Sequence, residues 1–201
     1  MKIYILEPPY SFWGYYSDIL VHGIASHSKG PSKGSLLLER TGPYIPPVSF
    51  PGNGSNIVIT DEFKDKLESS GLSGFAFQPV IKERIVDLDW QEWDDTSNDP
   101  PVYPGTGEPE DYILERPHSP DLAEKMGQLW EVLIENTASV EKVEPKNIFS
   151  DTKIYLITDS WNGDDIFRAY DVRYTYLSEK AKIWFHENAD KHVTLRESML
   201  K

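Results

Sequence analysis

The segment from Ser73 to Glu115 constrains the fold most strongly, because it joins a strong strand pattern to a loop rich in acid and proline. Val86, Leu88 and Trp90 alternate with polar residues, which predicts a half-buried strand with acidic side chains on its exposed face. In the loop that follows, residues 94–117, prolines remove backbone donors and the surplus acids repel one another. We therefore expect a long surface loop that is ordered at its flanks and mobile at its centre.

The acidity of the chain is concentrated in this segment. Residues 83–115 contain 11 Asp or Glu and one Arg, a net charge of −10 against −13 for the whole chain. Trp90, Trp93, Tyr103 and Tyr112 lie within it. An acidic surface with aromatic rings is typical of a docking face for a basic protein, since charge steers the encounter and rings supply desolvated contact area. A solvated loop beside core aromatics is the alternative.

Composition excludes several classes of function. The strongly negative net charge argues against binding to nucleic acid or to an anionic membrane, because both require a basic surface. The chain has no cysteine, which excludes disulfides, thiolate metal sites and cysteine nucleophiles. The apolar run near the N-terminus has only four residues and no stretch reaches membrane length, so we expect a cytoplasmic protein.

Short strand and helix patterns alternate without a regular strand–helix–strand rhythm. This predicts a single α+β domain over residues 1–201, with a mainly antiparallel mixed sheet, two to four short helices and the long acidic proline-rich loop. Thr60, Ser119 and Ser178 are expected to cap helices. Strands are expected at residues 2–6, 35–39, 56–59, 129–135, 153–158 and 193–197, loops at 21–34 and 41–56, and a hairpin that pairs 153–158 with 166–176.

Candidate partner-binding residues follow from the charge and aromatic pattern. Trp161 lies in an acidic turn and is expected to be exposed, as a second contact point. The candidate interface consists of Asp87, Asp89, Glu92, Trp93, Asp94, Asp95, Asp99, Tyr103, Glu108 and Asp111, together with Trp161, Asp164 and Asp165.

Catalytic and metal-binding patterns are weak. Asp87 and Asp89 would share one face of a strand and could bind a cation or act as acid and base, but an exposed strand face explains them equally well. The Asn162–Asp165 run is read as a tight turn, and the zinc-protease, phosphate-loop, dinucleotide and nucleophile-elbow motifs do not occur. We therefore predict no catalytic residues, no cofactor and no metal site.

Several stretches resemble the immunity proteins of bacterial polymorphic-toxin systems. These are IVITDEFKDKLESSGLSGFAFQPV from Ile57, GEPEDYI, the HSP…MGQLWEV segment and VTLRES, so the resemblance covers residues 57–198, and residues 1–56 are less distinctive. It implies a cytosolic antitoxin that binds a cognate toxin domain and blocks it, without indicating which residues bind. Related groups carry paired CxxC motifs, which are absent here.

Two other functions remain open from the sequence. A hydrolase could use two carboxylates of the acidic stretch, since an acid-rich sequence always offers candidate pairs. A structural interaction module without a toxin partner is the other. The function that we expect first is that of a toxin-neutralising protein, which requires no catalytic residues. Its expected partner is a basic toxin domain, and we expect no binding to nucleic acid or membrane. The sequence leaves the oligomeric state open.

Overall fold

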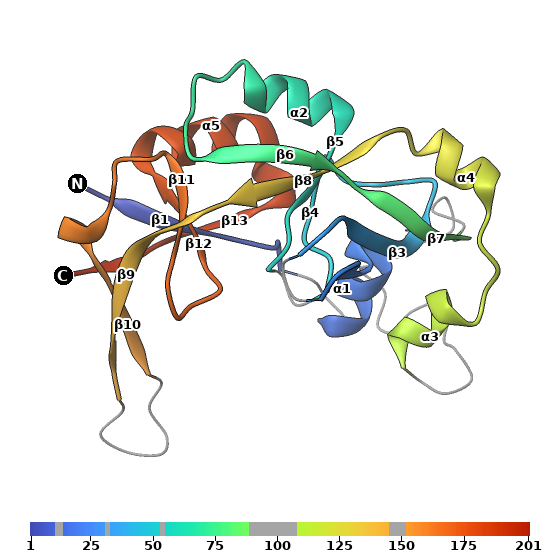
Figure 1. Cartoon of the computed structure of the whole chain (residues 1–201), viewed down its shortest axis with the longest axis horizontal. Helices are drawn as coiled ribbons and strands as arrows, with labels where there is room; N and C mark the ends of the chain where they lie inside the picture. Colours follow the sequence, from blue (N-terminus) through green and yellow to red (C-terminus); the bar gives the residue numbers. More distant parts are fainter. Residues whose placement is uncertain (11–13, 31–32, 53–54, 89–107, 145–151) are drawn as a thin grey trace. The chain divides into compact units, whose positions relative to one another are not determined.

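The computed structural model describes residues 1–10, 14–30, 33–52, 55–88, 108–144 and 152–201 (Figure 1). They form an α+β structure that consists mostly of sheet. By their contacts they divide into two compact units that interleave in the sequence. Unit 1 comprises Met1–Glu7, Leu67–Ala76 and Leu133–Lys201, and unit 2 comprises Pro8–Lys66 and Phe77–Val132.

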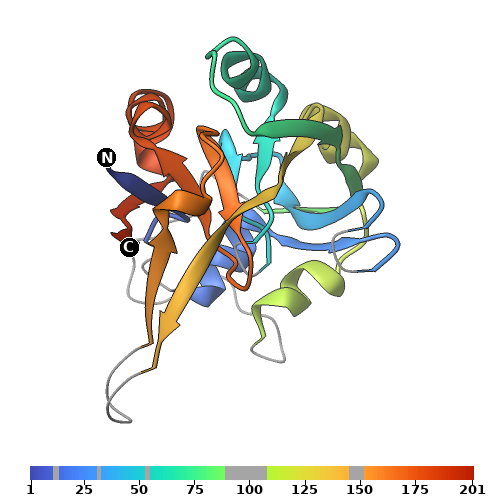
Figure 2. The ribbon, with the colours of Figure 1, turned by 60° about the vertical axis from the view of Figure 1, so that its left-hand side comes forward.

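Unit 1 is built on a seven-stranded sheet with the order β13-β1-β12-β11-β9-β10-β14. The pairs are antiparallel except for β11–β9 and β10–β14. Helix α5 (Glu179–Ala189) contacts β1 and β12 (Figure 2). The strands are β1 (Ile3–Glu7), β9 (Asn136–Val143), β10 (Lys153–Ile157), β11 (Ile166–Ala169), β12 (Thr175–Ser178), β13 (Thr194–Glu197) and β14 (Met199–Leu200), with 3-10 turns at Thr158–Ser160 and Asp190–His192.

Unit 2 contains a three-stranded sheet, β2-β3-β7, and most of a four-stranded sheet, β4-β5-β8-β6. Strand β3 lies at the centre of the smaller sheet, antiparallel to β2 and parallel to β7. The strands are β2 (Ile24–His27), β3 (Leu36–Gly42), β4 (Val48–Ser49), β5 (Val58–Thr60), β6 (Phe75–Pro79), β7 (Ile81–Asp87) and β8 (Leu129–Ile134), and the helices are α1 (Tyr15–His22), α2 (Asp61–Glu68), α3 (Pro109–Leu114) and α4 (Pro120–Lys125).

Two apolar clusters cover the two faces of the three-stranded sheet. Leu36, Leu38 and Ile85 point into the first, where they meet β5, β8 and α4. Val86 belongs to the second, where α1 and α3 pack. Because successive residues of a strand point to opposite faces, this sheet has an inner face that packs against β5, β8 and α4 and an outer face that carries α1 and α3.

A buried arginine organises the loop after β3. The Arg40 side chain is 0% exposed, and burial lowers the pKa of its guanidinium to about 9. Its Nε donates to the Thr41 carbonyl at 2.8 Å, while its terminal nitrogens donate to the Tyr44 carbonyl at 2.9 Å and to Ser49 Oγ at 3.4 Å. Since a buried charge is tolerated only when it is hydrogen-bonded, these acceptors hold the proline-rich loop against the strand.

The predicted helix caps are confirmed. The amide of Phe63 donates to Thr60 Oγ1 at 3.3 Å and starts α2. Ser119 and Ser178 accept in the same way from Leu122 and Ala181, at 3.4 and 3.2 Å. Short polar side chains at these positions satisfy amides that lack a partner inside the helix, which is why a local pattern identified all three.

The predicted hairpin between residues 153–158 and 166–176 is wrong. Strand β10 pairs with β9 and β14, whereas β11 pairs with β12 and β9. The amide of Ile166 donates to the Ser73 carbonyl at 3.0 Å, and that segment passes so close that a Cβ on Gly74 would lie 2.0 Å from the Ile166 carbonyl oxygen. Long-range pairing therefore overrides the Asn-Gly turn signal.

Four further expectations needed correction. The predicted loops at residues 21–34 and 41–56 contain β2 and β4, and the predicted acidic loop to residue 117 contains α3. The described residues form five α-helices, where two to four were expected. β2 was missed because its four residues are flanked by glycine and serine, and α3 because its N-cap, Glu108, makes no side-chain capping bond.

Tyr176 gives unit 1 a defined response to alkaline pH. Its side chain is 0% exposed, and its hydroxyl has no hydrogen-bond partner among the described residues. Burial raises the pKa of Tyr176 to about 12, from an ordinary value of 10.0. The protonated phenol therefore stabilises the fold fully below pH 10, and this contribution is lost as the pH rises toward 12.

We expect Tyr176→Phe to change the free energy of unfolding little at pH 7, since the hydroxyl makes no hydrogen bond, and to remove this alkaline loss. Urea unfolding of both proteins at intervals from pH 7 to 12 would measure it. The difference between them should grow in favour of the variant above about pH 10. Parallel profiles would contradict the assignment.

Candidate functional site

The two ends of the acidic segment are held together in unit 2. Asp87 ends β7, and Glu108 is the N-cap residue of α3. The hydroxyl of Tyr112, in α3, donates to the Asp87 carbonyl at 3.2 Å, and the ring of Tyr112 is 5% exposed. Ile113 beside it is 0% exposed, so α3 is anchored in the core. The described residues on either side of 89–107 therefore lie next to each other in unit 2.

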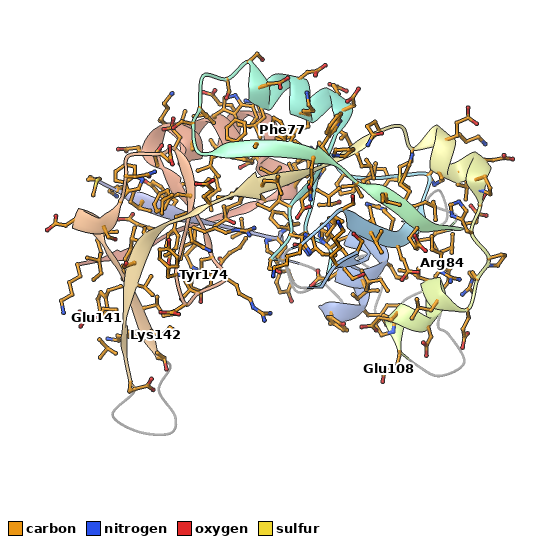
Figure 3. All side chains as sticks on the ribbon, viewed as in Figure 1. Phe77, Arg84, Glu108, Glu141, Lys142 and Tyr174 are labelled. Atoms are coloured by element: carbon orange, nitrogen blue, oxygen red, sulfur yellow. The ribbon has the colours of Figure 1, made fainter. Side chains whose placement is uncertain are left out.

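Further contacts make the base of the segment rigid. The Tyr15 hydroxyl donates to Glu110, and this hydrogen bond raises the pKa of Tyr15 to about 12. The Arg116 guanidinium lies 3.6 Å from the centre of the Tyr112 ring. Arg84, which projects from β7, donates to the Leu114 and Arg116 carbonyls at 3.0 and 2.8 Å (Figure 3).

Three predicted interface residues are described on this base. Asp87 and Glu108 are exposed and Asp111 is half-buried, and Figure 3 shows Glu108 at the start of α3. The centre of the acidic loop lies outside the described residues. That part includes seven predicted interface residues: Asp89, Glu92, Trp93, Asp94, Asp95, Asp99 and Tyr103.

The other predicted interface residues belong to unit 1, where Asp165 has a structural role. Its side chain is 15% exposed. One carboxylate oxygen accepts from Ser178 Oγ at 2.6 Å, and the other from the Ser73 amide at 3.2 Å and from Lys180 Nζ at 3.3 Å. Asp165 therefore links β12 and α5 to the segment that precedes β6. Asp164 accepts from the Asn162 side chain at 2.6 Å, within the turn.

Trp161 is half-buried and packs against the core of unit 1. Its ring stacks on Phe167 with centroids 5.5 Å apart, and its indole N–H donates to the Asp164 carbonyl at 2.9 Å. Both contacts serve the fold, since the first extends the core and the second closes the turn. The structure thus gives Trp161 a packing role at the position where a contact point was expected.

We expect Trp161→Ala to lower the free energy of unfolding by on the order of 2 kcal/mol, because it removes the stacked ring and the bond that closes the turn. Denaturant unfolding would measure the loss. Tyr170→Ala is the matched control: this side chain is 57% exposed, so its removal should cost at most about 0.5 kcal/mol. Equal losses would show that Trp161 does not support the core.

The sequence did not indicate a hollow on the three-stranded sheet. A cavity of about 280 Å³ is lined by Ile24, Ala25, Ser26, Leu37, Glu39 and Glu83. These residues come from three strands, and Glu39 and Glu83 lie far apart in the sequence. Glu83 was counted in the acidic segment, but only the pairing of β7 with β3 brings it beside Glu39.

Within the described ranges, no three His, Asp or Glu side chains are grouped so that they could hold a metal ion. The described helices include none that is both long enough and apolar enough to cross a membrane. The chain matches no protein-family model and no curated protein. The candidate site therefore consists of the acidic segment, the base formed by α3 and the end of β7, and the hollow on the three-stranded sheet.

Proposed function

We propose that this chain is an immunity-type protein that binds a basic toxin domain through the acidic surface of unit 2 and blocks it without catalysis. We use "acidic surface" for the described carboxylates Asp87, Glu108 and Asp111. The resemblance to immunity proteins suggests that the partner is a toxin domain, and the negative charge of the segment suggests that this domain is positively charged.

The observation that carries the proposal is the bond between Tyr112 and the Asp87 carbonyl. It holds the two described ends of the most acidic part of the sequence side by side on a buried support, so the carboxylates at these ends are presented from fixed positions. Fixed groups lose less conformational entropy on binding than groups on a free chain. A negative surface of this kind repels phosphate backbones and attracts a basic protein.

In this proposal the protein acts in the cytoplasm, where an immunity protein meets its toxin. The absence of cysteine is compatible with a reducing compartment, because nothing in the fold depends on disulfides.

The test is co-expression in a bacterial host with candidate toxin domains taken from the genes that flank the gene for this chain. We expect the chain to restore growth and to form a complex with the purified domain. If the domain arrests growth equally with and without the chain, and the two proteins do not associate in gel filtration, the proposal is wrong.

Neutralising the acidic surface should act mainly on the association rate. We expect Asp87→Asn/Glu108→Gln/Asp111→Asn to slow association severalfold at low salt and to flatten its salt dependence, because charges separated by more than about 8 Å are screened at physiological salt. The matched control, Glu135→Gln/Asp159→Asn/Glu187→Gln, removes the same charge from exposed positions of unit 1. Surface plasmon resonance would measure both rates. Equal slowing by both triple variants would show that only total charge matters.

A further inference from the structure

The described helices cover only part of the outer face of the three-stranded sheet. Strand pairing places Ile24, Glu39 and Arg84 in one row across β2, β3 and β7, and Ser26, Leu37 and Ile81 in the next. Paired residues of neighbouring strands point to the same face. Thr41, further along β3, lies under α1, where its hydroxyl donates to the Leu20 carbonyl at 2.6 Å.

The helical cover ends at Ile24. This residue packs against the cluster formed with α1 and α3, but Leu37 and Ser26 in the next row do not belong to it. Ser26 is exposed, and Ile81 at the far side of the row is 46% exposed. The strip beyond the described helices carries the 280 Å³ hollow. Pockets for small molecules usually enclose about 300–1,000 Å³, so this volume suits one long side chain better than a larger ligand.

A β-bulge brings Glu83 to the rim of the hollow. Leu38 pairs with Lys82 and Glu39 pairs with Arg84, so Glu83 is an extra residue in β7 without a partner in β3. An extra residue of this kind bends its strand and re-aims a side chain. Glu83 is exposed and lines the hollow together with Glu39.

The two cations beside Glu83 in the sequence are engaged elsewhere. Lys82 Nζ donates to the Ala123 carbonyl, and to the Gly127 carbonyl at 2.6 Å. Arg84 donates from its Nε to Glu39 at 3.1 Å, and another of its nitrogens donates to the Leu114 and Arg116 carbonyls at the end of α3. Among the described residues Glu83 has no hydrogen bond or ion pair from its carboxylate. The rim of the hollow thus carries one uncompensated negative charge above an apolar floor.

We propose that this hollow receives the side chain of a lysine or arginine from the basic partner, an assignment that rests on the proposed function for the identity of that partner. The alkyl part of this partner side chain lies on Ile24 and Leu37. Its cation lies against the Glu83 carboxylate and against Oε2 of Glu39, whose Oε1 accepts from Arg84. Long basic side chains combine an apolar stem with a charged end, which matches this lining. A phosphate would meet two carboxylates, and a purely apolar group would desolvate Glu83 without a partner.

The test uses a probe that needs no toxin. N-acetyl-lysine-methylamide is titrated into the whole chain at low salt and followed by amide NMR, with N-acetyl-norleucine-methylamide as the uncharged analogue of the same stem. We expect saturable shifts at Ile24, Leu37 and Glu83 with the lysine probe only. Equal binding of both probes, or shifts without saturation or spread over the surface, would overturn the assignment.

Matched variants then isolate Glu83. Glu83→Gln should weaken the lysine probe about fivefold, the upper range for a partly exposed ion pair. Glu124→Gln removes one charge from an exposed position of α4 in the same unit and should leave binding unchanged. If the two variants behave alike, the hollow is not a cation site.

The outcomes separate this inference from the proposed function. If the chain neutralises its toxin and Glu83→Gln binds that toxin as tightly as the original chain, the hollow is not used and the immunity function stands. If the lysine probe binds in the hollow but no toxin is neutralised, the immunity function fails and the hollow remains a site for a basic side chain.

Discussion

Unit 2 depends on the hydrogen bonds that the buried guanidinium of Arg40 donates. All three of its described acceptors are neutral oxygens, and they hold residues 41–49 around the side chain. Thr41, the next residue, points to the opposite face and fixes α1 through the Leu20 carbonyl. One dipeptide of β3 thus fastens the connector on one face of the sheet and a helix on the other. The position of α1 in turn decides how much of the outer face stays open. A residue that replaced Arg40 without these donors would leave buried carbonyl groups unpaired.

The surface of unit 2 around β7 carries less positive charge than its sequence suggests, because three basic side chains of β3 and β7 are turned to acceptors within the fold. Arg40, Lys82 and Arg84 all donate to backbone carbonyls, and only Arg84 also neutralises a carboxylate. Because a carbonyl group has no net charge, these hydrogen bonds stabilise loops and helix ends without pairing the three cations with carboxylates. The negative charge of Glu83 therefore stays unbalanced by its neighbours in the sequence. The potential that a partner meets is therefore set as much by the hydrogen bonds of the basic residues as by the number of acidic ones.

Local chemistry was predictable from the sequence, and long-range pairing was not. Thr60, Ser119 and Ser178 were identified as caps because a cap depends on residues within one turn. Strand β8 followed from hydrophobic alternation, and β1, β3 and β13 overlap other short runs that were assigned as strands. The hairpin assigned to β10 and β11 failed because their partners, β9, β12 and β14, are chosen by the whole sheet. The acidic segment was identified by composition, whereas the hollow depends on a bulge and on two strands far apart in the chain.

The bulge at Glu83 makes the charge on the surface of the sheet independent of the pairing of its strands. Leu37 to Glu39 pair with Ile81, Lys82 and Arg84, and this ladder does not use the residue between the last two. A chain lacking Glu83 could keep every one of these pairs in register, since the extra residue would simply disappear from β7. Replacement at this position likewise leaves the ladder unaltered. Single substitutions or a one-codon deletion can therefore change the charge at the rim of the hollow without refolding the sheet.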